Sequence, residues 1–191
     1  MKVRDITMNA MFIAITLILA LVPGLGMINI GFVSITIMHI PVIIAGLVLG
    51  AKAALINATA FGVAAMFIAA TRPVGVFDVL FVNPLVSVLP RIIFGLSIVV
   101  VAGLMKRITK NFVVVASVTS VVATLVHTVA VLLAMYIAAT GSTSPEILAA
   151  APTSALVLIG SVLLSNGIFE IIASVVIAVP TSVALNKVKN H

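Results

Sequence analysis

The chain has 191 residues, of which 63% are hydrophobic and 7% are charged, and its mean hydropathy is +1.45. This composition excludes a soluble globular domain and indicates an integral membrane protein. The net charge of +6 does not indicate a nucleic-acid partner, because the basic residues cluster at the ends of apolar segments. Without cysteine the chain has neither a disulfide framework nor a thiolate metal site.

Apolar segments separated by charges, glycines and prolines run through the chain. A spanning helix needs roughly 20 apolar residues to cross hydrocarbon about 30 Å thick, so the length has room for about six spans. They are predicted near residues 6–22, 34–50, 53–70, 86–105, 112–139 and 153–186. The last two exceed a simple span and are expected to tilt or project. We therefore predict an all-α integral membrane protein, a bundle of six transmembrane helices forming one domain over residues 1–191.

The distribution of basic residues predicts the orientation of the bundle. If the chain crosses six times, Arg72 and Arg91 lie toward one side, and the other side holds Lys2, Arg4, Lys52, Lys106, Arg107, Lys110, Lys187 and Lys189. Basic residues are enriched in cytoplasmic loops, so both termini are predicted to be cytoplasmic. The outward loops then cover about 23–33, 71–85 and 140–152. They either only connect the helices or roof a pocket.

The fourth span carries an arginine close to its start. Proline is tolerated in the first turn of a helix, so this helix is expected to begin near Pro90, after a broken segment that starts at Asn83. Arg91 then lies near the outer end, below a loop that carries Asp78. Three interpretations stay open: Arg91 snorkels to lipid headgroups, pairs with Asp78, or offers its planar guanidinium to the carboxylate of an anionic solute.

The fifth span places His127 and Thr128 near mid-membrane, with Tyr136, the one tyrosine of the chain, toward its outer end. Ionisable residues at this depth are candidates for a functional site because they are costly to bury in lipid. His127 is either a packing residue or a ligand contact. His39 is expected at the other end of the second span and His191 is the last residue, so no histidine pair for a metal site is predicted.

In the sixth span Asn166 and Glu170 are four residues apart, hence on one helical face, about midway along the span. Gly167 beside them permits close approach of a helix or a ligand. The pair either fixes packing through an interhelical hydrogen bond or contacts a solute. The sequence shows no phosphate loop, H-E-x-x-H motif, Ser-His-Asp group or carboxylate pair, so no enzyme is predicted. It also lacks the inverted repeat typical of a self-sufficient secondary transporter.

Three segments together resemble the substrate-binding S components of energy-coupling factor vitamin transporters: "ITIMHIPVIIAGLVLGAKAAL", "NPLVSVLPRIIFGL" and "NGIFEIIASVVIAVPTSVAL". The similarity extends over nearly the whole chain. It implies a six-helix subunit of the plasma membrane that holds a vitamin or its precursor at the extracellular side. It also implies docking onto a transmembrane coupling protein with two ABC-type ATPases. ATP would then be hydrolysed by these partners, and this chain would need no cofactor.

The same resemblance implies roles for individual residues. The docking alanine pair of the family corresponds to Ala10 and Ala14, a small-xxx-small pair of a kind that is common by chance in alanine-rich helices. The pocket of the family, formed by the outward loops and the outer halves of helices four to six, corresponds to the region of Asn83, Arg91, His127, Tyr136, Asn166 and Glu170. At position 127 this chain has histidine where the family pattern has asparagine.

The composition also bears on the solute. A compact aliphatic vitamin is favoured, because the chain has no tryptophan and one tyrosine for stacking on a flat ring. Pantothenate has a carboxylate, an amide and two hydroxyls, which suit one arginine and several amide or hydroxyl partners, and the sequence is similar to pantothenate-specific members. Pyridoxine and hydroxymethylpyrimidine are alternatives, because nine phenylalanines are available to stack on a ring. Alternatives of other classes are a structural subunit without a solute and a stand-alone proton-coupled carrier that uses Glu170 or His127.

Overall fold

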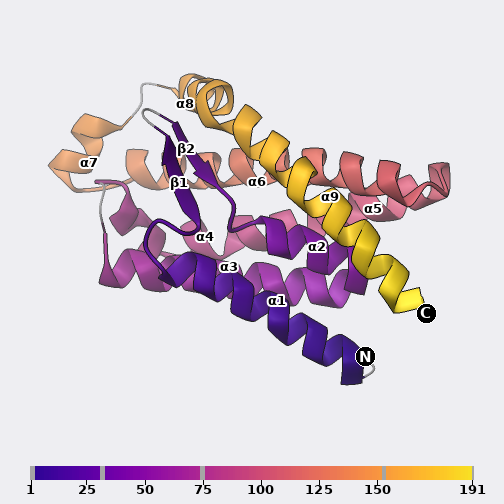
Figure 1. Cartoon of the computed structure of the whole chain (residues 1–191). Helices are drawn as coiled ribbons and strands as arrows, with labels where there is room; N and C mark the ends of the chain where they lie inside the picture. The colour runs from indigo at the N-terminus through magenta and orange to yellow at the C-terminus, as the bar shows by residue number, and fades with distance from the viewer. Residues whose placement is uncertain (1–2, 31–32, 74–75, 152–153, 191) are drawn as a thin grey trace.

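The computed structural model describes residues 3–30, 33–73, 76–151 and 154–190, which are predominantly helical (Figure 1). In chain order its elements are α1 (Val3–Leu21), β1 (Met27–Ile30), β2 (Val33–Thr36), α2 (Ile40–Leu49), α3 (Ala51–Thr71), the 3-10 turn η1 (Asp78–Val82), α4 (Pro84–Ser87), α5 (Leu89–Ile108), α6 (Phe112–Thr140), α7 (Pro145–Ala150), α8 (Ala155–Val162), the π-helical turn η2 (Leu163–Gly167) and α9 (Ile168–Asn190). The predicted helical membrane protein is confirmed, and a short β-hairpin is added to it.

Helical segments long and apolar enough to cross a membrane match five of the six predicted spans. Among the described residues these segments are Val3–Leu21, Ala51–Thr71, Pro84–Ile108, Phe112–Thr140 and Gly160–Lys189. The longest continuous helix is α6, whose 29 residues rise about 44 Å and so exceed the hydrocarbon thickness of about 30 Å. This length agrees with the expectation that the fifth span tilts or projects.

The segment near residues 34–50 takes a different form from the one predicted. Its first residues belong to the hairpin, in which β1 and β2 pair antiparallel with Met27 opposite Thr36. The ten residues of α2 then rise only about 15 Å. A full-length helical span here is therefore wrong, because a short apolar run rich in β-branched residues suits a strand as well as a helix. The count of six crossings stays a prediction.

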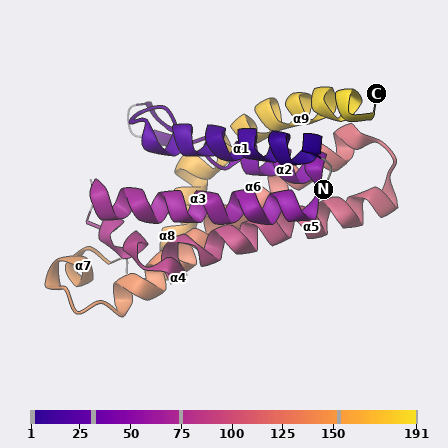
Figure 2. The same cartoon turned by 90° about the horizontal axis from the view of Figure 1, so that it is seen from below.

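Both ends of the described chain lie at one end of the bundle, whereas the hairpin and α7 lie toward the opposite end (Figures 1 and 2). The Arg4 guanidinium donates to the Lys189 carbonyl at 2.7 Å, and the Lys189 ammonium donates to the Val48 carbonyl at 2.7 Å. Cations are favourable there, because the last carbonyls of a helix lack intrahelical partners. The shared end agrees with an even number of crossings, and its cytoplasmic placement stays a prediction.

Helix α2 lies at the centre of the bundle and is buried from Ile40 to Val48. It ends at Gly50, where φ of 91° with ψ of −166° is a conformation open essentially to glycine, and α3 begins at the next residue. Helices α3 and α5 approach closely through small residues, since a Cβ added to Gly95 would meet the Ala58 methyl at 2.8 Å. Helices α2, α3 and α5 thus form the centre of the bundle.

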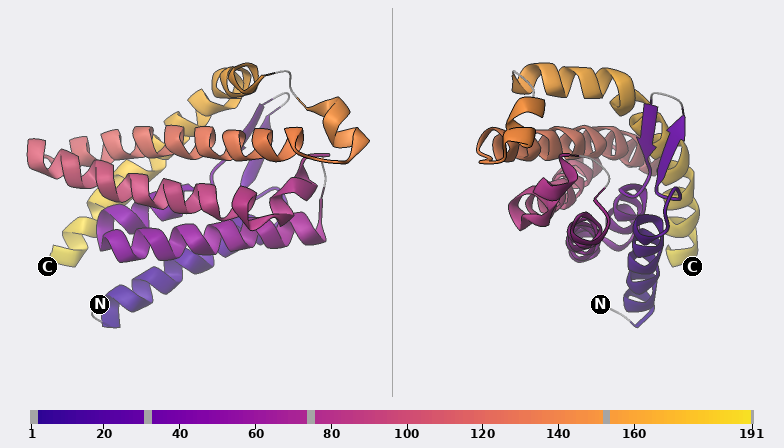
Figure 3. Two further views of the ribbon diagram at one scale, coloured as in Figure 1. Left: turned by 180° about the vertical axis from the view of Figure 1, so that it is seen from behind. Right: turned by 90° about the vertical axis from the view of Figure 1, so that its left-hand side faces the viewer.

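Two of the long segments are broken, and both breaks carry predicted site residues. Helices α4 and α5 meet at Val88 with Pro90 in the first turn of α5, so the predicted broken start of the fourth span is confirmed. In the last segment, η2 separates α8, which lies across the bundle, from α9, which runs along it (Figures 1 and 3). The segment predicted as one span over 153–186 is therefore bent, at a π-turn of the kind that is frequent at functional sites.

Candidate functional site

Arg91 is held inside the bundle by neutral partners. It is only 7% exposed, and its Nη1 donates to the Val86 carbonyl of α4 at 3.1 Å. Its guanidinium carbon lies 5.3 Å from the ring centroids of both Phe61 and Phe81, a distance at which cation–π attraction acts. The buried position does not fit a side chain that snorkels to lipid headgroups. Its Nε has no hydrogen-bond partner among the described residues.

His127 lies in a group of rings contributed by three other helices or helix ends. Its ring centroid is 4.8 Å from that of Phe94 and 5.6 Å from that of Phe61. It also stacks on His39, with 5.7 Å between centroids and 22° between planes. Because Phe61 contacts both His127 and Arg91, these side chains form one group. We call His39, Phe61, Arg91, Phe94 and His127 the imidazole–guanidinium cluster.

The place of His39 corrects the sequence interpretation. A full-length second helix would have put His39 at the far end of its span from His127. In the structure the hairpin occupies the start of that segment, so His39 directly precedes the short α2 and lies fully buried against His127. Within the described ranges no group of three or more His, Cys, Asp or Glu side chains is arranged to hold a metal ion.

Glu170 lies in a second polar group, between α6 and α9. Its carboxylate accepts from the Thr36 backbone N–H at 3.2 Å and from the Thr128 hydroxyl at 3.4 Å. One turn away, the Thr124 hydroxyl donates to the Ser174 hydroxyl at 3.1 Å. We call Thr124, Thr128, Glu170 and Ser174 the α6–α9 seam. It joins two helices and the end of β2.

The structure also places the remaining predicted pocket residues. Asn166 lies in η2, one turn before Glu170, half-buried and with no hydrogen-bond partner for its Oδ1 among the described residues. Tyr136 is half-buried on α6, about two and a half turns beyond His127 toward the end of that helix. Asn83 is exposed and caps α4, where its side chain accepts from the Leu85 N–H at 2.9 Å. The structure thus brings Arg91 and His127 together, and it gives Asn83 a local role in starting a helix.

Sequence reasoning missed three members of the imidazole–guanidinium cluster. Phe61 and Phe94 are fully buried on α3 and α5, and nothing in an apolar helix distinguishes a phenylalanine that faces a polar side chain from one that faces lipid. His39 carried a usable signal, because a histidine directly before an Ile-Pro pair marks the start of a helix rather than its middle. That start, combined with a hairpin before it, places the imidazole inside the bundle.

Several buried polar atoms of the cluster have no hydrogen-bond partner among the described residues. Buried native polar atoms are usually paired, and leaving one unpaired costs about 1 to 3 kcal/mol, so each needs an explanation. In the part of the chain that the structure describes, the unpaired buried side-chain atoms of the cluster are His39 Nδ1 and Nε2, Arg91 Nε and His127 Nδ1, and those elsewhere are Asn57 Oδ1, Thr119 Oγ1, Ser120 Oγ, Asn166 Oδ1 and Ser182 Oγ. The four atoms of the cluster supply donors and acceptors that a polar solute could use.

The predicted docking pair lies apart from this site. Ala10 and Ala14 are exposed on α1, and 17% of that helix's apolar window is buried, against 28% or more for the other four spanning segments. A weakly buried apolar helix with small residues on one face suits close approach by another helix within a membrane.

Known proteins resemble this chain in two ways. The curated protein "Pantothenate transporter PanT" from Leuconostoc mesenteroides subsp. mesenteroides is 32% identical over 101 residues, which cover 51% of this chain and 50% of the relative. The chain thus aligns with about half the length of that relative. The family model described as "ECF transporter, substrate-specific component" matches residues 4–182, nearly the whole chain. The chain is therefore a multi-pass plasma membrane protein that belongs to the family of substrate-specific components of energy-coupling factor transporters.

Proposed function

We propose that this substrate-specific component binds pantothenate in the imidazole–guanidinium cluster, with Arg91 as the partner of the carboxylate. The observation that carries the proposal is the buried guanidinium, whose identified partners are a carbonyl and two aromatic rings, all of them neutral. A cation buried among neutral groups gains most from an anionic ligand, and a carboxylate matches the fork of an arginine. Pantothenate supplies that carboxylate.

The neighbouring groups suit the rest of such a ligand. The amide and hydroxyls of pantothenate need donors and acceptors, and the unpaired nitrogens of His39 and His127 are of both kinds. The walls are phenylalanine rings rather than tryptophan or tyrosine, and these leave the hydrogen bonding to the polar atoms. The name of the partial relative, a pantothenate transporter, supports the same solute.

The family and the two ends of the bundle support a proposal for capture and delivery of the solute. The hairpin, η1, α4 and α7 gather at the end away from the termini, so a solute would enter there, from the extracellular side under the predicted orientation. The exposed Ala10 and Ala14 would dock on a transmembrane coupling protein, and two ABC-type ATPases would hydrolyse ATP. The whole chain would act as one transmembrane domain.

The first test is a binding titration. The purified protein in detergent would be titrated with pantothenate, pyridoxine, hydroxymethylpyrimidine, riboflavin and folate side by side. We expect saturable binding of pantothenate at micromolar or lower concentration, with the other four at least tenfold weaker. Tight binding of a different vitamin would reject pantothenate while retaining the transport role, and no binding of any vitamin would favour a structural subunit.

A second test concerns docking. Enlarging either alanine, as Ala10→Leu or Ala14→Leu, should abolish uptake by cells that supply the coupling protein and ATPases, because a larger side chain keeps helices apart. Pantothenate binding by the purified variant should be unchanged. The matched control is Ala70→Leu, an exposed alanine on α3. If binding were lost instead, α1 would serve the pocket rather than docking. Full uptake without the ATPases would indicate a stand-alone carrier.

A ring-shaped vitamin is the second candidate solute. The observation in its favour is the set of rings around His127, where Phe61, Phe94 and His39 all lie within 6 Å between centroids. Aromatic pairs at such distances are attractive, so pyridoxine or hydroxymethylpyrimidine could insert among them. The titration above distinguishes this candidate from pantothenate directly.

A further inference from the structure

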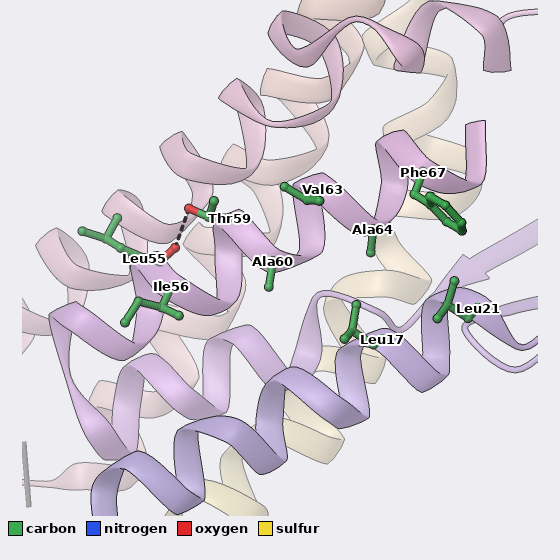
Figure 4. Close-up of a pocket in the computed structure, with 9 residues that line it drawn as sticks. All are labelled: Leu17, Leu21, Leu55, Ile56, Thr59, Ala60, Val63, Ala64 and Phe67. Carbon is green, nitrogen blue, oxygen red and sulfur yellow. Dashed lines mark hydrogen bonds between the residues drawn. The ribbon is translucent and has the colours of Figure 1, made fainter. Parts of the chain in front are cut away.

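Helices α1 and α3 enclose an apolar groove on the outer surface of the bundle, apart from the imidazole–guanidinium cluster. Its volume is about 720 Å³, and it is lined by Leu17, Leu21, Leu55, Ile56, Thr59, Ala60, Val63, Ala64 and Phe67 (Figure 4). The Thr59 hydroxyl, the one polar side-chain group in the lining, donates to the Leu55 carbonyl of its own helix at 2.9 Å. The groove therefore presents a hydrocarbon surface and no free polar group of its lining side chains.

Two hydrogen bonds hold the helices at either end of this groove. Near the termini, the buried Asn57 amide donates to Asn9 Oδ1 at 2.6 Å. At the other end, Arg72 Nη2 donates to the Leu21 carbonyl at 2.8 Å. Between these ties the wall of α3 has alanines at positions 60 and 64, whose methyl groups are too small to fill the space. The groove is thus fixed by the sequence of both helices.

The open end of the groove carries a positive charge. Arg72 is exposed and contacts Leu21, which lines the groove, and a guanidinium has five N–H donors. From Leu55 to Phe67 the groove follows α3 for about 18 Å, and Arg72 lies about 8 Å further along the helix axis. An acyl chain extended along the groove, with its negative group at the interface beside Arg72, fits this combination of shape and charge.

We propose that the α1–α3 groove binds one acyl chain of an anionic phospholipid, whose phosphate contacts Arg72. A lipid is favoured over a protein helix because the charge lies at the depth of the headgroups, while the whole lining below it is apolar. The site does not depend on which vitamin the protein binds. It also lies on the face of α1 that continues from Ala10 and Ala14, so a bound lipid would border the predicted docking surface.

Native mass spectrometry of the purified full chain tests this site. The protein would be titrated with phosphatidylglycerol and, separately, with phosphatidylcholine, and the retained lipids counted. We expect one phosphatidylglycerol retained about fivefold more than phosphatidylcholine, the size expected for one basic side chain near an anionic lipid. Arg72→Gln should remove this preference, Arg72→Lys should keep it, and Arg107→Gln, at an exposed arginine elsewhere, should leave it unchanged.

Filling the groove provides the second arm. Ala60→Phe should lower the retention of both lipids severalfold. If Ala60→Phe also lowers the melting temperature, Thr59→Phe, at an exposed position, replaces it and should lower the retention in the same way. The matched control is Ala134→Phe, which fills another apolar groove of about 530 Å³ between α5 and α6. Unchanged retention in folded Ala60→Phe and Thr59→Phe would overturn the proposal. Unchanged lipid retention in variants that no longer bind the coupling protein would also overturn it, and would make the groove a docking site for a protein helix.

Discussion

The imidazole–guanidinium cluster and the α6–α9 seam contain successive residues of α6, His127 and Thr128, yet their polar atoms differ in hydrogen bonding. In the seam, Glu170 accepts two hydrogen bonds and Thr128 also donates to the Thr124 carbonyl at 3.1 Å. In the cluster, both nitrogens of His39 and one each of Arg91 and His127 are buried without a hydrogen-bond partner in the described part of the chain.

This difference distinguishes polar groups that hold helices together from polar groups that are available to bind a solute. A paired polar group inside a membrane protein stabilises the contact between helices, and removing it costs stability. A buried group without a partner is costly to the folded protein by itself, so it persists where something other than folding requires it. We therefore propose that the seam serves packing and that the cluster binds the solute, although both contain residues of the same predicted pocket.

The largest effect should follow from Arg91→Ala. We expect pantothenate affinity to fall by about tenfold to a hundredfold, since a charge-assisted hydrogen bond is worth roughly 1.5 to 3 kcal/mol. A binding titration measures the loss, and the melting temperature in detergent shows whether the variant still folds. Arg107→Ala, at an exposed arginine outside the cluster, is the control. Unchanged affinity in a folded Arg91→Ala variant would remove the arginine from the site.

Glu170→Ala should act on stability instead. The substitution leaves the Thr36 N–H and the Thr128 hydroxyl without their acceptor, which should lower the free energy of unfolding by about 1 to 3 kcal/mol. Glu170→Gln keeps one acceptor and should lose less. Thermal unfolding in detergent measures both, with Glu146→Gln on the exposed side of α7 as control. If Glu170→Gln kept its stability and lost pantothenate binding, the carboxylate would belong to the ligand site.

The sequence predicted the helices of this fold better than the contacts between them. Long apolar runs gave five spanning segments, and the Pro90 signal gave the broken start of α5. The second span failed because residues 27–36 pair as strands, and strand pairing depends on a partner segment that local periodicity does not reveal. That one error also separated His39 from His127. The position of a residue along its helix was readable from the sequence, whereas the direction of each side chain around the helix axis was not.

The smallest effects, and the closest test of the comparison, come from His39→Phe and His127→Phe. Phenylalanine keeps the ring contacts and removes the unpaired nitrogens, so stability should hold or rise, because a buried polar atom without a partner is removed. Pantothenate affinity should fall about fivefold for each nitrogen that bonds the solute, the equivalent of a neutral hydrogen bond of about 1 kcal/mol. Tyr136→Phe removes a half-buried hydroxyl that lies nine residues along α6 and on the opposite face of that helix from His127, so it should change affinity less. A larger loss of pantothenate affinity in Tyr136→Phe than in either histidine variant would move the solute toward the outer end of α6. A loss of stability in both histidine variants would mean that the imidazoles pack the helices, as the polar groups of the seam do.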